Sequence, residues 1–141
     1  MEDGPTQLKF SSQSFSSDFH LALREHGFAV IEDHTIDLFK LNKVYYDWSK
    51  FFSSDEKKKY RRLESTDEGY VSFLSEQHKG CNLPDYKEFF QSHFQGWFPD
   101  FINLTATKLI LQQFFSFGER LVAGLERNLP KAVADGMQTP M

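Results

Sequence analysis

The histidines of this chain are the residues whose chemistry can be tested by spacing alone. A non-haem iron site needs a His-x-Asp or His-x-Glu pair on one turn and a distant second histidine, which together leave open positions on the metal. None of the histidines has Asp or Glu two residues later: His20, His26, His34, His78 and His93. The sequence therefore predicts no iron triad. Each histidine is interpreted as a surface or core side chain, with a metal ligand as the less favoured alternative.

The single cysteine, Cys81, leaves little room for thiol or zinc chemistry. One cysteine forms no disulfide within the chain, and a structural zinc site needs four Cys or His ligands at short paired spacings. A cysteine nucleophile needs a nearby base and an electropositive setting. The nearest histidine is His78, so we interpret Cys81 as a structural or incidental thiol. The sequence also lacks a Gly-x-Ser-x-Gly elbow and a glycine-rich phosphate loop.

A basic run, KKKYRR, occupies residues 57–62. We interpret it as a solvated helix end balanced by Glu64, Asp67 and Glu68, because Lys and Arg side chains are usually exposed. Contact with a phosphate or a carboxylate is the alternative. The formal net charge of the chain is −4. That mild acidity argues against a nucleic-acid surface, which needs a clustered basic excess.

The elements that must position these residues come from a short, aromatic-rich chain. Its 141 residues fit one domain, and they include 16 Phe, 5 Tyr and 2 Trp. Such a chain is not disordered, because disordered chains are poor in aromatic residues. The N-terminus has no basic start followed by an apolar run, and no stretch has the roughly 20 apolar residues of a membrane span. We therefore expect a cytoplasmic protein with no membrane contact.

The first third of the chain predicts a short strand followed by a helix, a strand and a second helix. Leu8 and Phe10 favour the first strand by their alternation. Ser17-Asp18 offers an N-cap for a helix that Gly27 ends, since glycine takes the left-handed C′ conformation without strain. Residues 28–31 are a compact apolar run typical of a buried strand. Thr35 is the expected cap of the second helix, which runs to about Phe52 with one apolar stripe: Leu41, Tyr45, Trp48 and Phe52.

The remainder predicts short strands and one long helix. Residues 53–56 begin another helical turn, with carboxylates where the helix dipole favours them. Residues 69–73 indicate a turn into a strand, and residues 86–94 a second strand with Phe90 on one face. Residues 80–84 and 96–100 are expected loops. A long helix is predicted from Asn103 to Asn128, with Pro130 ending it.

Five segments, taken together in order and spacing, resemble a known family. They are REHGFAVIEDH at 24–34, FFSSDEKK at 51–58, GY at 69–70, DYKEFF at 85–90 and WFP at 97–99. This pattern is similar to the N-terminal region of the isopenicillin N synthase-like 2-oxoglutarate/Fe(II)-dependent oxygenases. The resemblance covers about Leu8 to Leu129. It implies a non-haem dioxygenase N-terminal-like region at 1–129 and a connecting tail at 130–141.

The resemblance implies an α+β fold class. We expect a helix-rich N-terminal region with short strands and one long C-terminal helix, which would pack on a double-stranded β-helix (jelly-roll) core absent from this chain. The core carries the family's iron triad and the Arg-x-Ser that binds 2-oxoglutarate. No arginine here has Ser at the second following position. Fe(II) and 2-oxoglutarate are therefore implied for the full-length family, and we expect this chain to bind no cofactor and to have no catalytic residue.

The family's N-terminal region lends one wall to the active-site mouth, near its GY and KE segments. Carried over, this implies that Asp67, Tyr70 and Phe90 bind substrate. The structural alternative is that Tyr70 and Phe90 are core aromatic residues and that Asp67 is a solvated loop carboxylate.

Two functions from different classes follow from the sequence. The first is the N-terminal part of an oxygenase that helps to shape a substrate pocket and supports the catalytic core, inactive alone. The core would belong to the same polypeptide or to a separate chain, as in a split enzyme. The second is a non-catalytic α+β interaction module that dimerises or binds a partner through an aromatic-rich surface.

Overall fold

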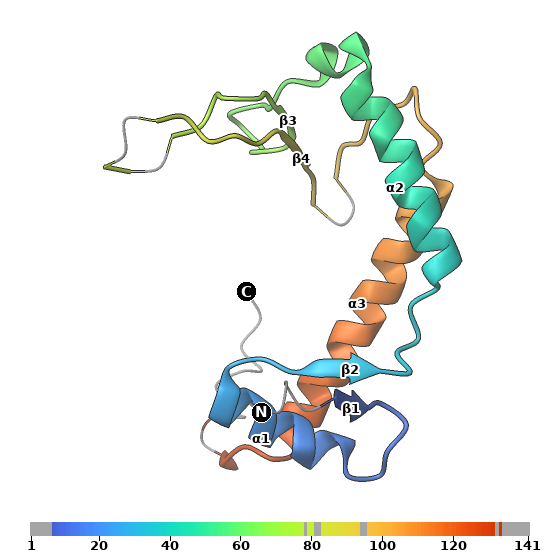
Figure 1. Ribbon diagram of the computed structural model, residues 1–141, viewed down its shortest axis with the longest axis vertical. Helices are drawn as coiled ribbons and strands as arrows, with labels where there is room; N and C mark the ends of the chain where they lie inside the picture. The colour runs from blue at the N-terminus through green and yellow to red at the C-terminus, as the bar shows by residue number, and fades with distance from the viewer. Residues whose placement is uncertain (1–6, 78, 81–82, 94–95, 132, 134–141) are drawn as a thin grey trace, which may run out of the picture. The chain divides into compact units, whose positions relative to one another are not determined.

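The computed structural model describes residues 7–77, 79–80, 83–93, 96–131 and 133. The chain divides into two compact units (Figure 1). Unit 1 comprises Met1–Asp37 and Gln112–Met141, and unit 2 comprises Leu38–Leu111. Over the described residues the fold is α+β, with short strands in two small sheets and one long C-terminal helix, and no barrel closes there. The predicted fold class is confirmed.

Unit 1 is built on a strand–helix–strand motif. Strand β1 (Gln7–Lys9) pairs in parallel with β2 (Val30–Glu32), with Leu8 opposite Ile31, and helix α1 (Phe15–His26) connects them. Leu8, Phe15 and Phe19 form the buried core of this unit. The end of the long helix contributes to it through Leu121 and Leu125, because their side chains pack against that core.

Two boundaries in unit 1 differ from the prediction. Helix α1 begins at Phe15 rather than after Ser17-Asp18, because Phe15 and Phe19 are buried one turn apart. Gly27 ends α1 in the left-handed conformation at φ 77°, as predicted. For the strand predicted at residues 28–31, both the bounds and the burial were wrong. Strand β2 starts at Val30, Phe28 is exposed, and a two-stranded sheet leaves β2 only half covered.

Helix α2 (Leu38–Ser53) belongs to unit 2 and begins later than predicted. Thr35 does not cap it, because the backbone before it is held elsewhere. The N–H of Ile36 donates to His34 Nδ1 at 3.3 Å, and the N–H of Asp37 donates to Gln113 Oε1 at 2.8 Å. The predicted stripe is also rotated: Tyr45 is 70% exposed, while Phe51 is fully buried.

After α2, unit 2 continues with a 3₁₀ turn and a hairpin. The turn η1 (Asp55–Tyr60) is capped by Ser54, whose Oγ accepts from the N–H of Glu56 at 3.1 Å. Strand β3 (Gly69–Val71) pairs antiparallel with β4 (Phe89–Gln91). Strand β4 is shorter than the predicted 86–94, and Phe94 lies outside the described residues.

The long helix α3 (Thr105–Glu126) confirms the prediction for residues 103–128 to within two residues at each end. The Asn103 side chain accepts from the N–H of Thr105 at 3.0 Å and so caps the first turn. The helix starts in unit 2 and ends in unit 1. No helix among the described residues is long and apolar enough to cross a membrane. Most of the predicted tail at 130–141 lies outside those residues.

Candidate functional site

An aromatic cluster forms the centre of unit 2. Phe51 is fully buried, and its ring centroid lies within about 6 Å of six other aromatic rings: Trp48, Phe52, Tyr60, Tyr70, Phe90 and Phe101. Edge and offset contacts of this kind add to the free energy of burial. The cluster joins α2, η1, the hairpin and the loop before α3, so it fixes the position of the β3–β4 hairpin.

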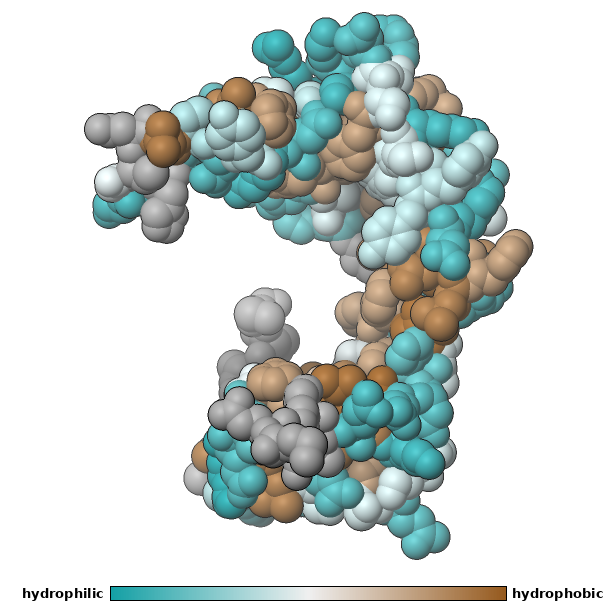
Figure 2. All heavy atoms as spheres, in the orientation of Figure 1, coloured by the Kyte–Doolittle hydropathy of each residue, from teal (hydrophilic) through white to brown (hydrophobic). Residues whose placement is uncertain are grey.

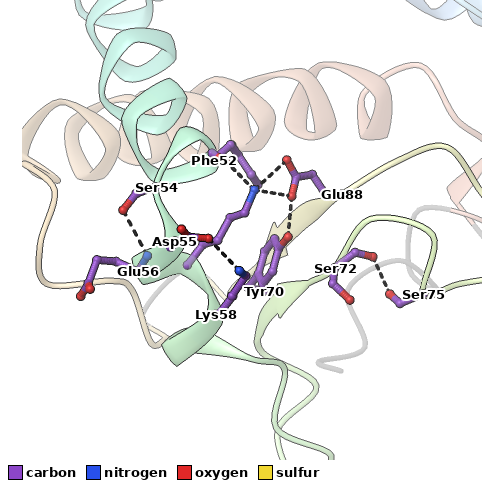
Figure 3. Close-up of polar contacts among 10 residues, drawn as sticks. Phe52, Ser54, Asp55, Glu56, Lys58, Tyr70, Ser72, Ser75 and Glu88 are labelled. Carbon is purple, nitrogen blue, oxygen red and sulfur yellow. Dashed lines mark hydrogen bonds and ion pairs between the residues drawn. The ribbon is translucent and has the colours of Figure 1, made fainter.

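A polar group adjoins this cluster (Figure 3). The Tyr70 hydroxyl donates to Glu88 Oε2, and the Lys57 ammonium donates to the same carboxylate at 2.9 and 3.2 Å. Lys57 Nζ also donates to the Phe52 carbonyl oxygen at 2.5 Å and lies 5.5 Å from the Tyr70 ring centroid. The Lys57 side chain is only 18% exposed and that of Glu88 26%. We call these three side chains the Lys57–Tyr70–Glu88 triad.

The triad shifts the pKa of each member in the direction that its contacts require. Burial opposes ionisation of Glu88, but the hydrogen bonds from Tyr70 and Lys57 outweigh burial and lower its pKa. The hydrogen bond to Glu88 raises the pKa of Lys57, and burial with the same carboxylate raises the pKa of Tyr70. At neutral pH the triad is therefore an ion pair with a neutral phenol. None of the three shifts creates a base poised near pH 7.

Glu68 holds the loop that follows the hairpin. Its Oε1 accepts from the N–H of His93 at 2.9 Å and from the N–H of Trp97 at 3.2 Å. Hydrogen bonds from these backbone amides, led by that of His93, lower the pKa of the Glu68 carboxyl. A Cβ placed on Gly96 would lie 1.7 Å from Glu68 Oε1. The loop can close on this carboxylate because residue 96 has no side chain.

The backbone conformation at residue 69 explains why the first position of the GY motif is a glycine. The φ of Gly69 is 123°, a conformation that residues with a Cβ rarely adopt. An added Cβ would also lie 2.8 Å from the Tyr60 carbonyl oxygen and 2.8 Å from Arg62 Cα. Glycine is therefore required where the first residue of β3 passes the end of η1.

The three predicted substrate residues all lie on this hairpin. Tyr70 and Phe90 are cross-strand partners, and Asp67 precedes β3. Tyr70 is buried, and Phe90 is half-buried against Trp48, Phe51 and Trp97. Asp67 has the accessible side chain: it is 61% exposed, forms an ion pair with Arg62 at 3.3 Å and accepts from the Gln91 amide at 3.2 Å.

The basic run at 57–62 is more varied than the sequence indicated. Lys58 is exposed and pairs with Asp55 at 2.7 Å (Figure 3). Lys59 is also exposed and pairs with Glu56 at 2.6 Å, so both lysines are in keeping with a solvated helix end. For Lys57 that reading was wrong, since it contacts an internal carboxylate. Glu68, expected to be a solvated balancing charge, is buried. The sequence feature that could have pointed to Lys57 and Glu88 is that both lie in segments that resemble the family, residues 51–58 and 85–90.

Fe(II) and 2-oxoglutarate are implied by the resemblance, but the described residues do not fit the metal. No group of three or more His, Cys, Asp or Glu side chains in the described part of the chain is placed to hold an ion. Cys81 and His78 lie outside that part.

Comparison with known proteins decides the family. A family model described as the N-terminal region of the non-haem dioxygenase in morphine synthesis matches residues 5–100. The chain belongs to this family. The predicted recognition of a non-haem dioxygenase N-terminal region is confirmed, and no curated protein matches the chain.

The fold of this non-haem dioxygenase N-terminal region is similar to a solved structure. It is the crystal structure of a protein from Shewanella oneidensis described as a candidate oxygenase, with a TM-score of 0.78 and 23% sequence identity. The match covers 96% of this chain and 49% of that one. The chain therefore spans about half the length of that protein.

Proposed function

We propose that this chain is the N-terminal part of a 2-oxoglutarate/Fe(II)-dependent oxygenase of the isopenicillin N synthase-like kind. It helps to shape the substrate pocket and supports a catalytic β-helix core. The observation that carries the proposal is the family match over residues 5–100, together with a fold match that covers about half of a longer candidate oxygenase. The chain is proposed to be inactive alone.

The β3–β4 hairpin is the proposed contribution to the pocket wall. Asp67 is the member of the predicted set with an exposed polar head, so it is the proposed contact to substrate. Tyr70 and Phe90 are proposed to act beside it, on the strands that the aromatic cluster and the triad hold in place.

The proposed partner of unit 1 is the β-helix core, in the same polypeptide or in another chain. Apolar side chains reach the surface of both units (Figure 2). On the part of α3 that belongs to unit 1, the exposed large apolar residues are Phe114, Phe115 and Val122. Exposed apolar area of this kind marks interaction surfaces. Cover by a large apolar sheet would remove it from water.

The sharpest test reads the coding frame and then measures turnover. A downstream His-x-Asp, a distant His and an Arg-x-Ser in the frame beyond Met141 would support the proposal. The protein so encoded should consume 2-oxoglutarate only with Fe(II), and the 141-residue chain should not. Iron-dependent turnover by the 141-residue chain would refute its inactivity. A frame that ends at Met141, with no β-helix chain co-purifying, would refute the oxygenase role.

The alternative is a non-catalytic module that forms a homodimer. It is favoured by α2, which exposes Leu38, Phe39, Tyr45 and Tyr46. Sedimentation equilibrium separates the two functions. A dimer that Phe39→Ser and Tyr45→Ser convert to monomer would favour the module. A monomer that melts cooperatively would count against it.

A further inference from the structure

A second site lies in unit 1, away from the hairpin. It is a pocket of about 300 Å³ between the turn after β1, the first turn of α1 and the end of α3. Its lining includes two arginines, Arg120 and Arg127, and three polar side chains, Ser12, Gln13 and Ser16. The volume is at the lower end of the range for small-molecule sites.

The charged side chains that line this pocket are all positive. None of its lining residues is acidic. Neither arginine forms an ion pair with a carboxylate of the described residues, whereas seven other Lys and Arg side chains of that part of the chain do: Arg24, Lys43, Lys57, Lys58, Lys59, Arg62 and Lys87. Two guanidinium groups with no carboxylate partner among the described residues therefore line one pocket, in a chain whose net charge is −4. They would be neutralised by two negative charges on a ligand.

The two arginines are spaced to act together. They are seven residues apart on α3 and the turn that follows it, which places them on one side about 10 Å apart along the helix axis. Between them lie Ala123, which has only a methyl group, and Gly124, which has no side chain, and both line the pocket. The flexible arginine side chains can converge over these two residues.

One of the arginines is held in place. The Arg120 guanidinium lies 4.2 Å from the centroid of the Phe10 ring, a cation–π contact that orients the group without using its N–H donors. Phe10 itself packs against Phe15 and Phe117 at centroid distances of 4.9 Å. Guanidinium groups presented in this way bind carboxylate and phosphate oxygens in bidentate fashion.

We propose that this pocket, the Arg120–Arg127 pocket, binds a small dianionic ligand through its oxyanion groups. Phosphate monoesters and dicarboxylates share that chemistry. The site does not depend on the proposed oxygenase function, because it uses no residue of the hairpin and needs no iron.

Thermal unfolding and titration calorimetry of the 141-residue chain test the proposal at constant ionic strength. The probes are phenyl phosphate, inorganic phosphate and succinate, with acetate and chloride as controls. We expect saturable binding of at least one dianion, at least tenfold tighter than acetate. Tighter binding of the phosphates would indicate a phosphate monoester as the ligand, and tighter binding of succinate would indicate a dicarboxylate. Binding of no dianion, or equal binding of acetate, would overturn the proposal.

Two variants locate the binding. Arg127→Gln should weaken it at least tenfold and leave the melting temperature of the free chain unchanged, since Arg127 makes no ion pair with the described residues. Arg24→Gln is the matched control, an exposed arginine of the same unit outside the pocket. Dianion binding that survives Arg127→Gln, or that Arg24→Gln weakens equally, would place it elsewhere. Arg120→Lys keeps the charge, so it should retain part of the binding even though the bidentate geometry is lost.

Discussion

Replacing Glu88 by glutamine removes the negative charge of the Lys57–Tyr70–Glu88 triad, keeps the shape of the side chain, and leaves the Lys57 ammonium without its carboxylate partner. The attraction across 2.9 Å is about 6 kcal/mol at an effective dielectric constant of 20, before the cost of desolvating both ions. Breaking a fully buried ion pair costs about 3–5 kcal/mol, and an exposed pair contributes about 0–1 kcal/mol. With both side chains mostly buried, we expect Glu88→Gln to cost about 2 kcal/mol.

Urea unfolding followed by circular dichroism measures this loss. With a slope of about 2 kcal/mol/M, the midpoint should fall by about 1 M at pH 7. Glu64→Gln is the matched control, because Glu64 is exposed and should shift the free energy of unfolding by less than about 0.5 kcal/mol. Lys57→Met combined with Glu88→Gln should cost less than the sum of the two single variants, because the two side chains interact directly.

The pH dependence gives an independent reading. The pKa of Glu88 is lowered in the fold, so its contribution is complete above its ordinary value of 4.5 and is lost as pH falls through the lowered value. The pKa of Lys57 is raised, so its contribution is complete below 10.5 and is lost as pH rises through the raised value. The difference between wild type and Glu88→Gln should therefore be flat between these limits and shrink at both ends. Equal stability of the two proteins at pH 7, or a difference that grows toward acid, would refute the reasoning.

Three further substitutions test the packing of unit 2, each by urea unfolding. Phe51→Ala should lower the free energy of unfolding by about 3–5 kcal/mol, because it empties the centre of the aromatic cluster. Phe39→Ala is the control and should change it very little, because that side chain is 84% exposed. Equal losses would contradict the central role of Phe51 in the cluster. Gly69→Ala should destabilise the protein strongly, because the added Cβ would clash with the backbone. Gly118→Ala places its Cβ in open space on α3 and should stabilise the protein by about 0.5–1 kcal/mol. If Gly118→Ala were the more destabilising of the two, the reasoning would be wrong. Gly96→Ala should lower stability and expose the His93 and Trp97 amides to hydrogen exchange, and unchanged protection would disprove the role of Glu68.

Local sequence patterns predicted which helices and strands form better than they predicted where each one begins and ends. Gly27 ends α1 because a left-handed residue is needed there, and that requirement is visible in the sequence. The start of α2 was missed because residue 37 donates to Gln113, a partner far along the chain. The rotation of α2 was missed for a similar reason. Periodicity gives an apolar stripe but not the side of it that Phe90 and Phe101 will cover.

The candidate site was predictable only through resemblance. Tyr70, Phe90 and Asp67 came from family motifs, and the structure brings all three to one hairpin. Composition led us to expect Lys57 and Glu68 in water, because charged residues usually are exposed. Their burial depends on tertiary partners, Glu88 for the one and two backbone amides for the other.

The division of the chain has a consequence for the order of folding. Unit 2 is a continuous stretch, residues 38–111, whereas unit 1 joins the two ends of the described chain. Closing unit 1 from an unfolded chain means bringing its ends together across everything between them, and this entropic cost grows with the length of the loop. A folded unit 2 replaces that loop by a rigid insert. We expect unit 2 to acquire its structure first, during synthesis, and the β1–α1–β2 motif to wait for the last turns of α3 before it becomes protected.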